Sequence, residues 1–207
     1  MEQRSEEWFK ARQGRVTGSA VGAILGVSPF TKPADVMRRM VRDWHGAPSE
    51  FKGNIATDWG TTNEAGAVAQ FEMRTGHIVE PCGFYTHEEW LGASPDGLVG
   101  TSGLLEVKCP FGLRDKTEPV FKTAKMQIHY YSQMQVQLYV TGRKICYFYQ
   151  WAPKGDDLEV VEYDQRYMDT ALKALRMFYD QYLKEREFPY AEKYLDGQTQ
   201  QLQTSQA

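Results

Sequence analysis

The chain has 207 residues, of which 42% are hydrophobic and 13% aromatic, and its formal net charge is −3. This length supports one globular domain with a substantial core, and no apolar run approaches the ~20 residues of a membrane span. Three widely spaced cysteines argue against a disulfide framework or a zinc site. The N-terminus lacks the apolar segment of a secretory signal, so cytoplasmic residence is expected.

The net charge does not exclude nucleic acid as a partner, because affinity depends on where cations cluster. Cations gather in three groups, whereas acidic residues concentrate between Asp156 and Glu162 and toward the C-terminus. The three groups are Lys10, Arg12 and Arg15; Arg38, Arg39 and Arg42; and Arg114, Lys116, Lys122 and Lys125.

The first part of the chain predicts helices. A helix is expected to begin at Ser5, where Glu6 and Glu7 suit the first turn, and to break at Gly14. A second helix is expected to begin near Thr17 and to end at Gly26. Two more are predicted over 33–44 and 57–76, the latter with Gly76 as its stop.

The rest of the chain alternates strands and helices. Strands are predicted over 77–85, 145–152 and 159–163, and helices over 126–140 and 165–187. The polar segment 196–207 is expected to be a disordered tail, which leaves 1–195 as the single domain. This order predicts an α/β fold with a mixed central β-sheet flanked by helices.

A tight hairpin is predicted between the strands that carry Asp96 and Glu106. If the loop is 100–102, Asp96 lies opposite Glu106 and Ser94 lies opposite Lys108, so the four side chains share a face. A slip of one residue would turn Asp96 to the other face. The hairpin therefore predicts a site made of two carboxylates and an ammonium group.

Two carboxylates this close repel each other unless a cation lies between them, and oxygen ligands suit Mg²⁺ or Mn²⁺ better than Zn²⁺. Such ions assist phosphodiester hydrolysis, and Lys108 could orient or deprotonate the water or neutralise developing charge. The alternative is that Asp96 is a turn residue, while Glu106 and Lys108 form a surface pair on an edge strand. Charged residues within so apolar a strand need partners, and this argues against a surface pair.

The order of motifs resembles the bacteriophage lambda exonuclease and YqaJ-type viral recombinase nucleases of the PD-(D/E)XK superfamily, over almost the whole chain. This resemblance implies a restriction-endonuclease-like core. The motifs that carry it are Trp8-Phe9-Lys10-Ala11-Arg12-Gln13-Gly14 with Thr17-Gly18-Ser19; Trp59-Gly60 with Glu64; Ser94-Pro95-Asp96-Gly97; Leu105-Glu106-Val107-Lys108-Cys109-Pro110-Phe111; and Gln133-Met134-Gln135-Val136-Gln137.

The resemblance also implies roles for individual residues. Asp96, Glu106 and the carbonyl of Val107 would be metal ligands, with Glu64 as a further ligand to a second Mg²⁺. Lys108 would be the catalytic lysine. Gln135 matches a glutamine motif near the active site, whereas Gln137 is expected to be structural. The resemblance further implies a pocket for the 5′ phosphate of a DNA end, formed by Arg12, Ser19, Ser94 and Arg114. Guanidinium groups and hydroxyls are suitable donors for such a phosphate.

The implied activity is 5′ to 3′ exonuclease digestion of linear double-stranded DNA, which releases mononucleotides and leaves 3′ single strands for annealing-type recombination. A homotrimeric ring, a single-strand annealing partner and a phage or prophage origin in a bacterial host cell are implied by the same resemblance. Two alternatives stay open on the residues: a structure-specific or restriction-like endonuclease, and a catalytically inactive DNA-binding module. A capsid-associated structural role would leave Asp96, Glu106 and Lys108 unexplained.

Overall fold

The computed structural model describes residues 2–50 and 53–195 as two sheets and their covering helices. Hydrogen bonds join the strands in the orders β2-β5-β6-β7-β8 and β1-β4-β3. The helices are α1 (Glu6–Arg12), α2 (Gly18–Ile24), α3 (Pro33–Trp44), α4 (Ile55–Thr75), α5 (Ile128–Thr141) and α6 (Gln165–Glu185), with 3-10 turns at Phe111–Leu113 and Tyr190–Tyr194. The strands are β1 (Val16–Thr17), β2 (Val79–Glu80), β3 (Tyr85–His87), β4 (Leu91–Ala93), β5 (Gly97–Val99), β6 (Gly103–Lys108), β7 (Ile145–Ala152) and β8 (Gly155–Glu162).

Local capping signals account for the helix ends that the sequence predicts well. Ser5 caps α1 by accepting the Trp8 N–H, and α3 occupies the predicted residues. Helix α4 begins two residues before the predicted start, because the Asn54 side chain accepts the N–H groups of Ala56 and Thr57. Gly76 ends it with φ of 71°, a left-handed conformation that costs glycine little.

The strand predictions are less accurate. The strand predicted over 77–85 is wrong, because Val79–Glu80 and Tyr85–His87 are separate strands in different sheets. Pro81 lies between them and has no N–H to donate to a ladder. Strand β4 was not predicted, and β8 begins at Gly155 rather than Glu159. The predicted tail, 196–207, lies outside the described residues.

The five-stranded sheet is mixed, as predicted. Strand β6 pairs antiparallel with β5 and parallel with β7, and β8 pairs antiparallel with β7. Gly97 lies opposite Leu105 and Val99 opposite Gly103, so the loop is 100–102 as expected. This register confirms that Asp96 meets Glu106 across the hairpin.

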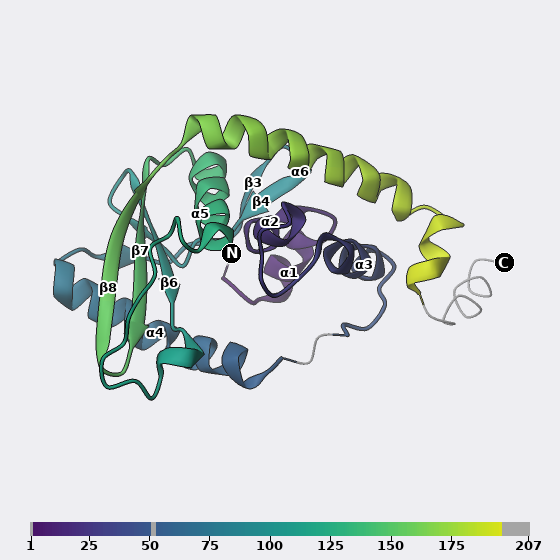
Figure 1. Ribbon diagram of the computed structural model, residues 1–207. Coiled ribbons are helices and arrows are strands. Elements are labelled where there is room, and N and C mark those ends of the chain that lie inside the picture. Colours follow the sequence, from purple (N-terminus) through teal and green to yellow (C-terminus); the bar gives the residue numbers. More distant parts are fainter. Residues whose placement is uncertain (1, 51–52, 196–207) are drawn as a thin grey trace.

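Helices cover both faces of this sheet (Figure 1), and strand alternation assigns each residue of β6 to one of them. Leu104 packs with residues of α5 such as Met134 and Leu138. Leu105 lies on the opposite face, in a cluster with Phe71 of α4. Glu106 therefore faces α5, inside a layer that is otherwise apolar.

A second core lies beside the sheet. Helices α2, α3 and α6 share a buried cluster that includes Val21, Val41 and Leu175. Helix α6 extends from the end of β8 over α5 toward α3 and so connects the sheet to this helical part (Figure 1). Among the described residues, no helix is both long and apolar enough to span a membrane.

Candidate active site

The predicted carboxylate pair lies at the end of the β5–β6 hairpin. The Asp96 N–H donates to the Leu105 carbonyl at 3.0 Å, which extends the ladder by one step. The Asp96 Oδ2 atom accepts the Val107 N–H at 2.6 Å. Main-chain bonds therefore hold the Asp96 carboxylate beside β6, on the side where Glu106 lies.

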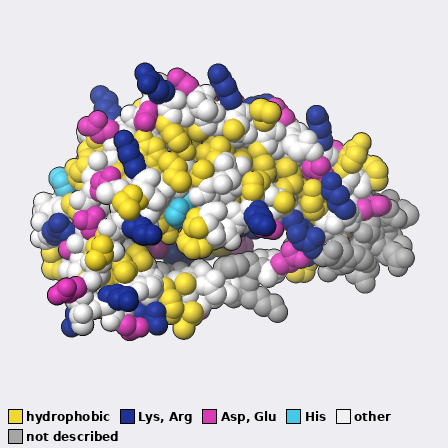
Figure 2. Space-filling view, viewed as in Figure 1, with side chains coloured by type: hydrophobic (Ala, Val, Ile, Leu, Met, Phe, Trp, Pro, Cys, Tyr) yellow, Lys and Arg dark blue, Asp and Glu magenta, His cyan; other side chains and the backbone are white. Residues whose placement is uncertain are grey.

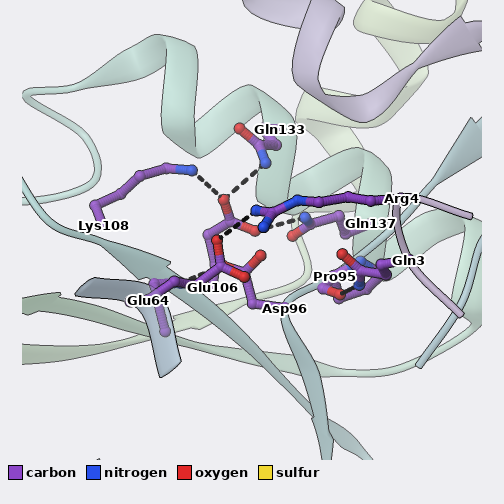
Figure 3. Close-up of polar contacts among 10 residues, drawn as sticks. Gln3, Arg4, Glu64, Pro95, Asp96, Glu106, Lys108, Gln133 and Gln137 are labelled. Atoms are coloured by element: carbon purple, nitrogen blue, oxygen red, sulfur yellow. Dashed lines mark hydrogen bonds and ion pairs between the residues drawn. The ribbon is translucent and has the colours of Figure 1, made fainter. Parts of the chain in front are cut away.

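Glu106 is almost completely buried, with 1% of its surface exposed, and three side chains donate to it. Its Oε1 atom accepts from the Lys108 ammonium and from Gln133 at 2.7 Å. Its Oε2 atom accepts from Gln137 at 2.6 Å. Figure 3 shows Lys108 and Gln133 converging on one end of this carboxylate. A buried carboxylate needs such donors, because an unpaired charge in the interior costs several kcal/mol.

The structure places the glutamines of α5 differently from the expectation drawn from the sequence. Gln135 bonds the main chain where β8 meets α6: its amide donates to Glu162 O at 2.8 Å, and its Oε1 accepts the Asp164 N–H at 2.7 Å. Gln133 and Gln137, four residues apart on α5, share the helix face that contacts Glu106. Gln137, expected to be structural, therefore contacts the Glu106 carboxylate as Gln133 does, and i,i+4 spacing was the signal that could have identified both.

The charges of the site are strongly coupled. Burial and the neighbouring Glu106 charge raise the pKa of Asp96 well above its ordinary value, although Lys108 opposes this effect. Burial alone would lower the pKa of Lys108, but the charges of Glu106 and Asp96 together raise it above its ordinary value. Lys108 is therefore protonated at neutral pH. As placed here, it presents a positive charge to the two carboxylates.

Glu64 approaches this group from α4 but is held by an unexpected partner. The Arg4 guanidinium lies 3.1 Å from the Glu64 carboxylate and extends across the site from the segment before α1 (Figure 3). Gln3 anchors that segment by donating to the Pro95 carbonyl at 2.7 Å. Nothing in the sequence pattern indicated Arg4, because only the tertiary structure brings the N-terminal segment to the hairpin.

Within 2–50 and 53–195, no three His, Cys, Asp or Glu side chains gather closely enough to share one metal ion. The donor set of the hairpin nevertheless fits a hard cation. Asp96 and Glu106 offer carboxylate oxygens, and Val107 adds a carbonyl at the same strand end. Burial, and then repulsion from Glu106, raise the pKa of Asp96, and a divalent cation would relieve that repulsion. Asp96, Glu106 and Val107 are thus suitable ligands, with Glu64 nearby on α4.

Three of the four predicted phosphate ligands belong to one cluster. Arg12 donates to the Ser19 hydroxyl at 3.3 Å, and its guanidinium carbon lies 4.1 Å from the Trp8 ring centroid. Trp8 donates to the Ser94 hydroxyl at 3.0 Å. Burial, followed by the charge of Arg39, lowers the pKa of Arg12 to about 10. Arg39, which belongs to a different cation group in the sequence, therefore adds a second guanidinium near this cluster.

Arg114 and Ser94 depart from the expected placement. Arg114 bonds within its own segment, to the Phe111 carbonyl at 2.9 Å and to Asp115 at 3.0 Å, and no bond to the Arg12 cluster is found among the described residues. Ser94 does not lie opposite Lys108, because Pro95 interrupts the ladder and the strand before it, β4, belongs to the other sheet. Its hydroxyl donates to the Gly83 carbonyl instead.

A cleft of about 880 Å³ is lined by Glu64, Val107, Lys108 and Tyr130 among others. The space-filling view shows this face hollowed above α4, with apolar side chains gathered over the elements above the hollow (Figure 2). The walls of this cleft carry the Glu64 carboxylate and the ammonium groups of Lys108 and Lys122, and cations in a large cleft suit an extended anionic substrate.

Comparison with known proteins identifies the family. The YqaJ-like viral recombinase domain matches residues 7–144, which include the hairpin, Glu64, Arg12 and the glutamines of α5. The chain belongs to this family. Arg4 lies before the matched residues, so the family match alone would not have drawn attention to it.

Solved structures agree with this family membership. An alkaline exonuclease, LHK-Exo from Laribacter hongkongensis, is 28% identical with a TM-score of 0.73, over 96% of this chain and 100% of that one. The same protein in complex with dAMP gives a TM-score of 0.74. A phage-related exonuclease from Haemophilus somnus shares the fold, with a TM-score of 0.65 at 18% identity, over 84% of this chain and 96% of that one.

One curated viral relative is much longer than this chain. Uncharacterized protein R354 of Acanthamoeba polyphaga mimivirus is 28% identical over 162 residues, which cover 72% of this chain but only 29% of that protein. The chain thus spans less than a third of that relative's length.

Proposed function

We propose that this protein is a metal-dependent 5′ to 3′ exonuclease that acts on the ends of linear double-stranded DNA. It releases mononucleotides and leaves 3′ single strands for recombination by annealing. The observation that carries the proposal is the meeting of Asp96, Glu106 and Lys108 at one strand end of a chain that matches an alkaline exonuclease over 96% of its length. The dAMP complex of that exonuclease supports a mononucleotide product.

The residues divide the chemistry among them. Asp96, Glu106 and the Val107 carbonyl would hold Mg²⁺, or Mn²⁺ in its place, with Glu64 serving a second ion. Such ions polarise the phosphoryl oxygen, lower the pKa of a bound water and stabilise the leaving oxygen. Lys108, protonated beside Glu106, neutralises charge that develops on the phosphate. Gln133 and Gln137 keep the Glu106 carboxylate in a single orientation.

The Arg12 cluster supports the polarity in this proposal. A terminal 5′ phosphate carries close to two negative charges at neutral pH, and guanidinium and hydroxyl donors bind such a group well. Arg12 and Ser19 supply these donors, and Ser94 is linked to them through Trp8. An internal phosphodiester carries only one charge, so this cluster favours a chain end over the interior of a strand.

Assembly and partners form part of the same proposal. A ring-shaped homotrimer would let duplex DNA enter and the spared strand leave, and a single-strand annealing protein would receive the 3′ strand in the host cell. Light scattering at micromolar concentration tests the assembly, since a monomer there would contradict the ring.

The decisive experiment compares linear and closed circular duplexes, with a 5′ or a 3′ label on the linear one, in Mg²⁺ or EDTA. Wild type should release the 5′ label first, as mononucleotide, from linear DNA in Mg²⁺ only. Lys108→Ala should be inactive, whereas Lys154→Ala, which removes an exposed lysine between β7 and β8, should retain activity. Cutting of the circle would favour an endonuclease, and no cutting of either DNA would favour a binding module.

A further inference from the structure

Three aromatic side chains form a continuous row that begins at the catalytic lysine. The Lys108 ammonium nitrogen lies 4.9 Å from the ring centroid of Tyr130. The Tyr130 and His129 centroids are 4.0 Å apart, and those of His129 and Phe30 are 5.6 Å apart. Tyr130 and His129 open the first turn of α5, and Phe30 lies in the loop between α2 and α3. The row therefore leads from the site of hydrolysis outward.

This row lines two neighbouring cavities. All three rings line the cleft that contains Glu64 and Lys108. They also line a second cavity of about 160 Å³, whose walls include Ser19 and Gln133. Ser19 belongs to the Arg12 cluster, and Gln133 bonds Glu106. A nucleotide that extends from the carboxylates to Ser19 would thus have its base beside these rings.

The chemistry of the row suits a base better than a phosphate. Burial, and then the charge of Lys108, lowers the pKa of His129, so its ring is uncharged at neutral pH. The buried Nε2 atom of His129 has no hydrogen-bond partner in the described part of the chain. Phe30 is 77% exposed, although a large aromatic side chain gains nothing from facing water. Figure 2 shows apolar side chains gathered beside the hollow that this cleft forms.

Removal of a terminal nucleotide needs such a surface. The phosphodiester can reach buried carboxylates only if the terminal base leaves its pair and its stack, which costs a few kcal/mol. Stacking on aromatic side chains returns about 1–3 kcal/mol per base and tolerates any sequence, because every base has a π-face. An exonuclease that must remove all four nucleotides benefits from this kind of recognition.

We propose that Phe30, His129 and Tyr130 form a stacking surface for the unpaired base of the 5′-terminal nucleotide while that nucleotide is removed. This inference rests on the proposed exonuclease function and adds a base subsite between the carboxylates and the Arg12 cluster. The subsite recognises nucleobases by stacking and not by hydrogen-bond pattern.

The first test uses two 5′-phosphorylated duplexes that differ only at the terminal nucleotide: an adenine mismatched with adenine, and an abasic residue opposite adenine. Neither end is paired, so the comparison isolates stacking on the protein. Wild type should favour the adenine end by about 5- to 150-fold in kcat/KM. Phe30→Ala should lower this preference by roughly 2- to 13-fold, and Phe30→Trp should retain it.

The control and the contrary outcomes are specific. Tyr190→Ala removes an aromatic side chain that is 61% exposed outside the cleft, and it should keep the wild-type preference. Equal losses on both duplexes in Phe30→Ala would assign the ring a structural role and overturn the proposal. No preference in wild type would also overturn it.

A second measurement does not depend on turnover. The mismatched terminal base is replaced with 2-aminopurine, and its fluorescence is followed as wild type or Phe30→Ala binds in EDTA. Stacking should quench the fluorescence at saturation in wild type and quench it less in the variant. Equal quenching in the two proteins would refute the subsite. If wild type cut neither duplex yet quenched the probe, the exonuclease would be refuted and the base subsite retained.

Discussion

Asp96→Asn is expected to stabilise the protein in EDTA at pH 7 while abolishing nuclease activity. Burial, and then the charge of Glu106, which is itself 1% exposed, raise the pKa of Asp96 despite the opposing charge of Lys108. The ionised form therefore costs folding free energy. Asparagine removes the charge but keeps an oxygen for the Val107 N–H that Asp96 accepts at 2.6 Å.

The magnitude follows from the environment of the carboxylate. A charged group withdrawn from water without full compensation costs about 1–3 kcal/mol, so Asp96→Asn, at a half-buried position, should raise the free energy of unfolding by about that amount. For a domain of this size each kcal/mol moves Tm by roughly 2–4 °C, which gives an increase of roughly 2–12 °C. Asp169→Asn, at an exposed position on α6, should change the free energy by less than about 0.5 kcal/mol.

The pH dependence has a definite sign. A raised pKa means that the folded protein holds the Asp96 proton more tightly than the unfolded chain does. The stability from that proton is fully present below the ordinary pKa of 3.8 and is lost as pH rises through the raised value. The advantage of Asp96→Asn should therefore be largest at neutral pH and shrink on acidification.

Differential scanning calorimetry at several pH values, in EDTA and in Mg²⁺, measures these effects. Mg²⁺ should raise the Tm of wild type more than that of Asp96→Asn, because only wild type offers both hairpin carboxylates. If Asp96→Asn were less stable than wild type in EDTA at pH 7, attraction between Asp96 and Lys108 would outweigh the burial and repulsion that we invoke. That result would refute the reasoning.

Three further predictions follow from the contacts. Gln137→Leu should lower kcat roughly 10- to 100-fold, because it removes a hydrogen bond to Glu106. Gln135→Leu should keep its kcat but lose about 1–3 kcal/mol of folding stability, measured by urea unfolding. The reverse pattern would contradict our assignment of the two glutamines. Gly22→Ala should lower the free energy of unfolding by about 1–3 kcal/mol, because the added Cβ would lie 2.7 Å from the Cβ of His129. Gly66→Ala in α4 meets nothing within 4 Å and should raise the free energy of unfolding by roughly 0.5–1 kcal/mol. Equal effects of the two substitutions would refute the packing argument. Arg4→Gln should lower the half-saturating Mg²⁺ concentration up to about fivefold, because it releases Glu64 from its ion pair. Arg166→Gln, at an exposed position, should leave that concentration unchanged. A higher half-saturating concentration in Arg4→Gln would show instead that Arg4 aids metal binding.

Local signals in the sequence determined most of the helices and the hairpin. Ser5, Pro33 and Gly76 mark helix ends through bonds and backbone angles that involve only their neighbours. The register of the Asp96–Glu106 pair followed from a three-residue loop, because alternation along two short strands leaves few alternatives. The family resemblance rested on the same segments.

Tertiary structure decided which polar residues complete the site. Arg4, Gln133 and Gln137 reach the carboxylates from the N-terminal segment and from α5, and the choice between Gln135 and its neighbours depends on how α5 is rotated against the sheet. The strand predicted over 77–85 divides between two sheets for a similar reason, since partners distant in sequence select each half. Local propensity acts over a few residues, whereas a site assembled from several elements depends on contacts that form only when the chain packs.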